Sequence, residues 1–271
     1  MQQRRSRRPR RRRVLAAGAA LAGSAGALVV GEAVWVVRRR LPSVVGMDAS
    51  GFVPGGAGAD RGPGRTLRMV ILGDSTLTGP GLSSPEEIWV RQALADLDLP
   101  APVEVVSLAV GGSRVADVRR RVPDALAVGP DVALVAVGSN DAIHGTPARR
   151  FAADLDDVLV SLLGPVPVVA VSNVGDLGNV ARVPRPLKSV LRRRSRSICR
   201  QVEEVVSRHE RAVLLDVTPS NPGFRDRGVF SADLFHPNRS GHALWATAAR
   251  SGLHAAFCTL GEDHAARRTS S

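Results

Sequence analysis

The chain has 271 residues, a formal net charge of +12 and two cysteines. This length suits one sizeable domain or two small ones. With 44% hydrophobic and 23% charged residues, the composition is that of an ordinary globular protein and excludes a chain that is disordered throughout. Two cysteines are too few for a disulfide-dense scaffold or for a zinc module with four cysteine ligands.

The positive charge is concentrated at the N-terminus. Residues 1–40 contain eleven arginines and a single acidic residue, Glu32. Without this segment, the 37 basic and 25 acidic residues of the chain fall to 26 and 24, so the rest of the chain has a net charge near +2. A body with this balance has no general basic field, and we therefore expect no nucleic-acid partner.

An apolar stretch of 24 residues, 14–37, follows the first arginines. As a helix it would be about 36 Å long, enough to cross the ~30 Å hydrocarbon core of a membrane. Eight arginines precede it and three follow it, which favours a cytoplasmic N-terminus and an extracytoplasmic body. We interpret residues 1–40 as a basic N-terminus with a single transmembrane anchor in the cell membrane. The alternatives are secretion after signal cleavage, a buried helix and a nucleic-acid-binding arm.

Residues 41–65 hold seven glycines and three prolines, and we interpret them as a mobile linker. The folded domain is expected over residues 66–260, and the polar residues 261–271 as a frayed tail. Apolar runs predict strands over residues 66–72, 103–110, 132–137, 166–171 and 212–217. Helices are predicted between and after them, over residues 84–97, 115–126, 147–163, 187–208 and 240–257. This alternation predicts an α/β fold with a parallel sheet covered by helices on both faces.

Chemically capable residues directly follow the predicted strands. Four short blocks do so: GDS at residues 73–75, GGS at 111–113, GSND at 138–141 and DLFH at 233–236. Each block alone is ordinary turn chemistry. Because functional groups collect beyond the carboxyl ends of parallel strands, four such blocks together indicate one site at that edge. Residues 172–178, after the fourth strand, are expected to shape its cleft.

Over residues 66–260 the chain resembles the GDSL esterases, also called SGNH hydrolases. The resemblance rests on GDSTLTG at residues 73–79, on GSND at 138–141, on DLFHPN at 233–238, and on Gly112, with Gly111 as the alternative for that block. It implies a three-layer α/β/α sandwich with a parallel, flavodoxin-like sheet of about five strands and a serine esterase site. Thr76 stands where the family often has Leu or Ile, a departure that does not touch the chemistry.

The chemistry of ester cleavage gives each of these residues a role. Ser75 is the expected nucleophile, His236 its general base, and Asp233 the carboxylate that orients the imidazole. The backbone N–H groups of Ser75 and Gly112 and the side-chain amide of Asn140 are the expected oxyanion hole. Structural roles are the alternatives: a helix cap for Ser75, a turn residue for Asn140 and a structural histidine for His236. The neighbours within each block favour the catalytic roles.

The remaining polar residues are expected to be structural. Asp74 and Asp141 are expected to tie loops to backbone N–H groups, and His144 and His242 to lie at the surface or behind the site. The other histidines form no ligand spacing, so no metal and no cofactor is expected. The arginines of residues 187–208 are interpreted as a solvated helix face. Whether Cys199 and Cys258 pair is left open by the sequence.

These observations predict a membrane-anchored serine hydrolase of the esterase or lipase type, with its catalytic domain outside the cytoplasm. It would cleave carboxylic esters of small molecules, carbohydrates or lipids through an acyl-serine intermediate. The alternatives are a cell-envelope O-acyltransferase or deacetylase acting on a sugar polymer, and a non-catalytic binding module. The body lacks G-x-S-x-G, which argues against an α/β-hydrolase of another superfamily.

Overall fold

The computed structural model of the chain describes residues 27, 28, 30–32, 34, 35, 42–56 and 65–269, of which 262–269 are described by their backbone alone. The described residues form one six-stranded sheet in the order β1-β3-β2-β4-β5-β6. The strands are β1 (Gly51–Val53), β2 (Leu67–Gly73), β3 (Val103–Ser107), β4 (Val132–Ala136), β5 (Val168–Ser172) and β6 (Ala212–Leu215). Strands β2 to β6 are parallel, and β1 pairs antiparallel with β3 at the edge. This confirms the predicted fold class and adds a sixth strand.

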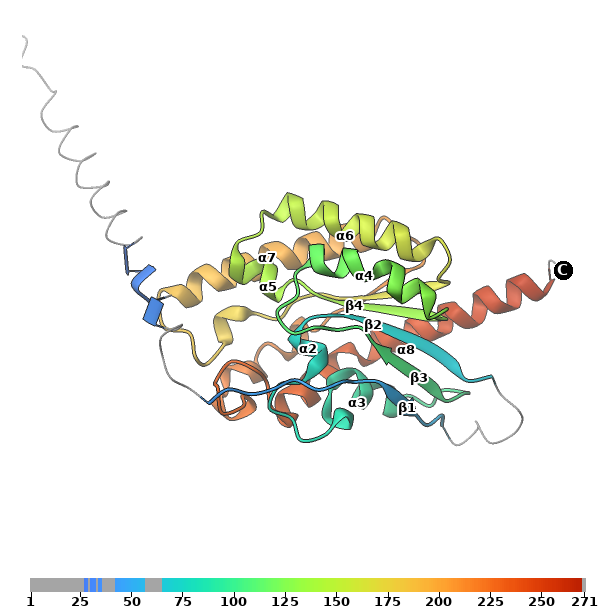
Figure 1. Cartoon of the computed structure of the whole chain (residues 1–271), viewed down its shortest axis with the longest axis horizontal. Helices are drawn as coiled ribbons and strands as arrows, with labels where there is room; N and C mark the ends of the chain where they lie inside the picture. The colour runs from blue at the N-terminus through green and yellow to red at the C-terminus, as the bar shows by residue number, and fades with distance from the viewer. Residues whose placement is uncertain (1–26, 29, 33, 36–41, 57–64, 270–271) are drawn as a thin grey trace, which may run out of the picture.

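Helices cover both faces of the sheet (Figure 1). They are α2 (Ser75–Thr78), α3 (Trp89–Ala95), α4 (Val115–Ala127), α5 (Ser139–His144), α6 (Ala148–Leu163), α7 (Leu187–Val206) and α8 (Arg239–Thr269). Helices α4, α6 and α7 lie on one face, and α3 and α8 on the other (Figure 1). Short 3-10 turns connect them: η2 (Pro85–Glu87), η3 (Leu177–Asn179), η4 (Thr218–Ser220), η5 (Gly223–Arg225) and η6 (Arg227–Val229).

The predicted helix over residues 84–97 is divided in two. Ser84 caps the 3-10 turn η2, and its hydroxyl accepts a hydrogen bond from the backbone N–H of Glu86 at 3.3 Å. Ile88 then takes an extended conformation (φ −69°, ψ 131°), which ends the turn before α3 begins at Trp89. The cap and proline signal therefore marks the turn, and the apolar spacing marks the helix after it.

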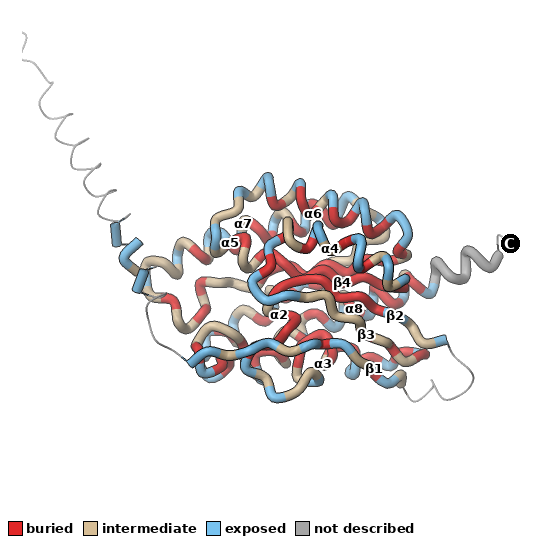
Figure 2. The backbone as a smooth tube through the Cα atoms, in the orientation of Figure 1, coloured by how far each residue is buried: buried red, intermediate tan, exposed pale blue. Residues whose placement is uncertain are grey.

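Each central strand supplies side chains to two cores, which explains its unbroken apolar run. Met69 and Ile71 of β2 pack on the side of α3 and α8, whereas Val70 and Leu72 pack on the side of α4, α6 and α7. All four side chains are fully buried, because alternate residues of a strand point to opposite faces. The tube in Figure 2 accordingly shows the sheet as the buried layer of the molecule.

Residues 42–56, within the range interpreted as a linker, form an extended segment that includes β1. Ala49 is fully buried in this segment and Val53 is 3% exposed. Residues 57–64 lie outside the described part of the chain. At the other end, the backbone of α8 continues to Thr269, through most of the range predicted as a frayed tail.

The predicted membrane anchor, residues 14–37, lies mostly outside the described residues. Among the residues that are described, no helix is both long and apolar enough to span a bilayer. Glu32, within the predicted anchor, is described: its Oε2 accepts a hydrogen bond at 2.8 Å from the backbone N–H of Leu187, the first residue of α7. The anchor and the cleaved signal both stay predictions.

Candidate active site

The predicted site residues gather beyond the carboxyl ends of the parallel strands. Ser75 begins α2 directly after β2, and Asn140 lies in α5 directly after β4. Gly112 lies in the loop after β3, and His236 precedes α8. Side chains or backbone of all four residues line a single open depression, so segments far apart in the sequence meet at one place.

Asp233 and His236 form a hydrogen-bonded pair within one tight turn. Oδ2 of Asp233 lies 2.7 Å from Nδ1 of His236, and Oδ1 accepts hydrogen bonds from the backbone N–H groups of Phe235 at 2.9 Å and His236 at 3.0 Å. Leu234, between them, takes φ 56°, which lets the chain fold back on itself. Burial alone would raise the pKa of Asp233, but these hydrogen bonds outweigh it and hold the pKa below its ordinary value. A charged Asp233 fixes the proton on Nδ1 and leaves Nε2 free as a base.

Ser75 is presented by a short helix that its neighbour caps. The side chain of Asp74 accepts a hydrogen bond from the backbone N–H of Thr76 at 2.9 Å, and α2 ends at Thr78. The Ser75 hydroxyl makes no hydrogen bond to the described residues, including His236. Both side chains nevertheless line the same two depressions. Hydrogen bonds between catalytic groups often have long distances in the absence of substrate and shorten when substrate binds.

Asn140 is held in place by two acceptors. Its Nδ2 lies 3.3 Å from Oδ2 of Asp74 and 3.2 Å from the backbone oxygen of Ser113. The helix that carries it begins after Gly138, which takes φ +126°; a Cβ there would lie 2.8 Å from Ile198. Only glycine satisfies both the backbone angle and the close packing.

Gly112 takes φ +82° and a Cβ added there would meet no atom within 4 Å, so its backbone faces open space. A Cβ on Gly111 would instead lie 3.9 Å from Cβ of Ser75. Both glycines line the open depression, and the left-handed conformation of Gly112 requires a glycine or a strained residue there.

Burial changes the proton affinity of the carboxyl group behind the site. It raises the pKa of Asp74 to about 6, although the hydrogen bond from Thr76 acts in the opposite direction. Asp74 therefore does more than the loop-tying role expected for it, because it caps α2 and orients the Asn140 amide. The sequence shows both residues but not this contact across 66 positions.

Asp141 and the two nearby histidines have structural contacts. Oδ2 of Asp141 accepts a hydrogen bond at 3.0 Å from the backbone N–H of Val115, which joins α5 to the start of α4, as expected. His144 is exposed, and its Nδ1 lies 2.8 Å from the backbone oxygen of Asn140. His242 is fully buried: its Nδ1 accepts from the backbone N–H of Trp89, and burial lowers its pKa to about 3. A neutral His242 is therefore part of the core behind the site.

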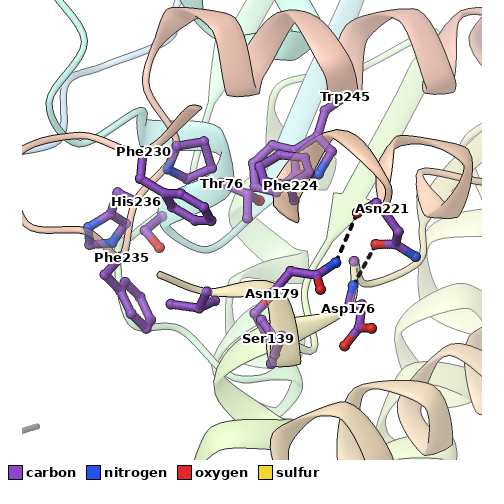
Figure 3. A pocket seen from close by; sticks show the side chains of 15 residues that line it. Thr76, Ser139, Asp176, Asn179, Asn221, Phe224, Phe230, Phe235, His236 and Trp245 are labelled. Carbon is purple, nitrogen blue, oxygen red and sulfur yellow. Dashed lines mark hydrogen bonds between the residues drawn. The ribbon is translucent and has the colours of Figure 1, made fainter. Parts of the chain in front are cut away.

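A second, apolar pocket adjoins the open depression, and Ser75 and His236 line both. Figure 3 shows its aromatic walls, with Phe224 and Trp245 facing Thr76 and with Phe230 and Phe235 beside His236. Gly175, Asp176 and Leu177, in the range expected to shape the cleft, also line it. Its aromatic residues could not be predicted from the sequence, because they lie in irregular segments and in α8 and follow no pattern that marks a pocket.

The two cysteines are not paired. Cys199 is buried with its thiol on the backbone oxygen of Val174 at 2.7 Å, and Cys258 is exposed. Burial raises the pKa of the Cys199 thiol to about 11, so it is an inert core group.

Comparisons with known proteins point to one family. The model of the GDSL-like lipase/acylhydrolase family matches residues 71–244. The GDSL-like esterase Rv1075c of Mycobacterium tuberculosis is 28% identical over 185 residues, which are 66% of this chain and 59% of that relative. This chain thus spans less than two thirds of the relative's length.

Solved structures with the same fold include two bacterial proteins. A member of the lipolytic G-D-S-L family from Veillonella parvula has 16% identity and a TM-score of 0.56, and the match covers 68% of this chain and 96% of that one. An acetylxylan esterase, Axe2, from Geobacillus stearothermophilus has 18% identity and a TM-score of 0.51, with 68% and 93% covered. At these identities the likeness concerns the fold.

Proposed function

Because this chain belongs to the GDSL-like lipase/acylhydrolase family, whose model matches more than half of its length, we propose that it is a carboxylic ester hydrolase with Ser75 as nucleophile. The proposal rests above all on one observation. His236, which is hydrogen-bonded to Asp233, lines the same open depression as Ser75, Gly112 and Asn140.

The reaction divides into two steps. Oγ of Ser75 attacks the ester carbonyl carbon while Nε2 of His236 takes the hydroxyl proton, and the charged Asp233 stabilises the resulting imidazolium. Collapse of the tetrahedral intermediate breaks the bond to the alcohol oxygen, which receives the proton from His236. A water molecule, activated by the same imidazole, then attacks the acyl-serine and releases the acid.

The negative charge on the carbonyl oxygen needs donors in fixed positions. Within the described residues, the backbone N–H groups of Ser75 and Gly112 have no hydrogen-bond partner, so both are available to an oxyanion. The Asn140 amide is the proposed third donor. Its two N–H bonds point to Asp74 and Ser113 at 3.3 and 3.2 Å, so one of these long bonds has to be exchanged for the bond to the oxyanion. Removal of one such donor typically lowers kcat by about 10²–10³-fold.

Hydrolysis of p-nitrophenyl acetate and butyrate by the purified chain tests this proposal. Ser75→Ala is expected to reduce the rate to background, whereas Ser83→Ala, an exposed serine before η2, is the matched control and keeps full activity. Full activity of Ser75→Ala would overturn the assignment of the nucleophile.

The second candidate function is removal or transfer of acetyl groups on a sugar. The similarity in fold to an acetylxylan esterase and the open depression beside Ser75 favour it. Release of acetate from acetylated xylooligosaccharides separates it from an esterase for small esters. Appearance of a new acetylated sugar, in place of free acetate, identifies an acyltransferase.

We also propose that residues 14–37 anchor the chain in the cell membrane with the catalytic domain outside the cytoplasm. The support is the apolar length and the arginine bias of the sequence. A C-terminal reporter fusion that is active only outside the cytoplasm, on a chain that keeps its N-terminus in the membrane fraction, would agree with an anchor. An N-terminus that begins after residue 37 would show a cleaved signal instead.

A further inference from the structure

Residues 42–53, which we call the N-terminal strap, run past α2 and end in β1 at the sheet edge (Figure 1). The backbone N–H of Met47 donates to the oxygen of Thr78 at 2.7 Å, and the N–H of Gly81 donates to the oxygen of Val45 at 3.4 Å. A Cβ on Gly46 would lie 2.5 Å from Oγ1 of Thr78, so the two segments are in close contact. The strap is thereby fixed against the helix that begins with the proposed nucleophile.

The far end of the strap is held by a buried arginine. Arg91 of α3 is 6% exposed, and its guanidinium donates to the backbone oxygens of Ala49 at 3.2 Å and Phe52 at 3.0 Å. Oγ of Ser50 accepts from the backbone N–H of Ser107 at 3.0 Å. These bonds and the pairing of β1 with β3 make the strap part of the catalytic domain.

The strap forms one wall of the open depression. Val44, Gly46, Met47 and Asp48 line it together with Gly112 and Asn140, and Ser75 and His236 are at its junction with the apolar pocket. The depression has a volume of about 710 Å³, against about 70 Å³ for the apolar pocket. An ester held at Ser75 therefore has a small aromatic pocket on one side and a large open space along the strap on the other.

We propose that the strap forms the leaving-group subsite of the ester substrate and that this subsite takes a hydroxyl-bearing alcohol, with the acyl group in the apolar pocket. This inference rests on the proposed function. The aromatic side chains of the apolar pocket favour a short hydrocarbon chain, because these side chains contribute to binding mainly by burying apolar surface. His236 lies at the junction, where it can return its proton to the alcohol oxygen.

Polar groups on the strap suit the hydroxyls of such an alcohol. Oδ1 of Asp48 accepts hydrogen bonds from the backbone N–H of Ser50 at 2.9 Å and from its hydroxyl at 2.7 Å. These bonds fix the carboxylate, and its Oδ2 has no partner among the residues that the structure describes. Thr78, Ser107 and Gly111 line the same space as Asp48. A fixed carboxylate oxygen is a strong acceptor for a sugar or polyol hydroxyl.

The test keeps the acyl group constant and changes the alcohol. The ratio of kcat/KM for 6-O-acetylglucose to that for ethyl acetate is measured by acetate release for the full chain. Asp48→Ala and Met47→Ala are expected to lower this ratio at least fivefold, because both side chains line the subsite. Val45→Ala is the matched control: its side chain is 81% exposed and outside the depression, so the ratio stays within twofold.

A second series with ethyl acetate, butyrate and hexanoate tests the division between the two subsites. Asp48→Ala and Met47→Ala are expected to keep the wild-type order of acyl preference, whereas Phe230→Ala is expected to shift the preference toward longer acyl chains. Unchanged alcohol preference in both strap variants, or a change in acyl preference instead, would overturn the inference while the esterase activity stands. A wild-type chain that hydrolyses none of these esters would overturn the proposed function, and this inference with it.

Discussion

The carboxylate of Asp233 offers the sharpest test of the proposed chemistry, through Asp233→Asn. Asn keeps one carbonyl oxygen, which can still accept the two backbone hydrogen bonds of 2.9 and 3.0 Å from Phe235 and His236. It places an amide N–H₂ where the second carboxylate oxygen lay, 2.7 Å from Nδ1 of His236. An N–H donor at that place favours the tautomer with its proton on Nε2, which cannot act as the base.

The expected loss is about 10³–10⁴-fold in kcat, which corresponds to roughly 4–5.5 kcal/mol of transition-state stabilisation. The cost in stability is smaller, about 1.5–3 kcal/mol, because only the charge-assisted bond to His236 is lost. Asp233→Ala is expected to be less stable than Asp233→Asn, because it also leaves two backbone N–H groups without their acceptor.

Initial rates with p-nitrophenyl acetate give kcat, and urea unfolding gives the free energy of unfolding of the same preparations. The pKa of Asp233 is below its ordinary value, so its stabilisation is present at neutral pH and is lost as the pH falls through the folded-state pKa. Asp233→Asn lacks this pH dependence. A folded Asp233→Asn protein that keeps more than a tenth of the wild-type kcat would refute the role of Asp233 as the group that orients His236.

Three further predictions follow from the site and the core. Asn140→Ala is expected to lower kcat about 10²–10³-fold with little change in KM, measured with p-nitrophenyl butyrate. A higher KM with an unchanged kcat would contradict the place of Asn140 in the oxyanion hole. Because the pKa of Asp74 is raised to about 6, ionisation of Asp74 lowers the stability of the fold as the pH rises from about 4 to 6. The stability of Asp74→Asn relative to wild type should therefore rise over that range, by up to about 3 kcal/mol in urea unfolding, and a constant difference would show that Asp74 does not titrate there. Leu72→Ala, at a fully buried position of β2, is expected to cost about 2–5 kcal/mol, whereas Val160→Ala, at an exposed position, should change stability by less than about 0.5 kcal/mol. Equal effects would contradict the placement of the core.

The parallel strands and their helices could be predicted because their signal is local. An apolar run such as residues 132–137 has both faces buried, and its length and alternation with helices leave few other folds. The edge strand β1 could not be predicted, because Gly51, Phe52 and Val53 form a strand only through β3 and the guanidinium of Arg91, about 40 residues away. The glycines and prolines around these three residues make the segment resemble a linker in the sequence.

In the candidate site, too, contacts between residues close in the sequence could be predicted, and contacts between distant residues could not. Asp233 and His236 are three residues apart, so their contact follows from one turn. The hydrogen bond between Asp74 and Asn140 joins the segments that follow two neighbouring strands, β2 and β4, and no spacing in the sequence indicates it. The aromatic pocket is assembled from irregular segments and α8, whose side chains meet only after the whole fold has formed.

The antiparallel pairing of β1 has a consequence for the solubility of the domain. It occupies the outer hydrogen-bonding edge of β3, whose neighbour on the other side is β2. A shortened chain that begins at residue 66 would leave that backbone edge unpaired, and a bare edge recruits strands from other molecules. Strand β1 thus protects the domain from aggregation, and the smallest soluble catalytic fragment should begin before residue 42.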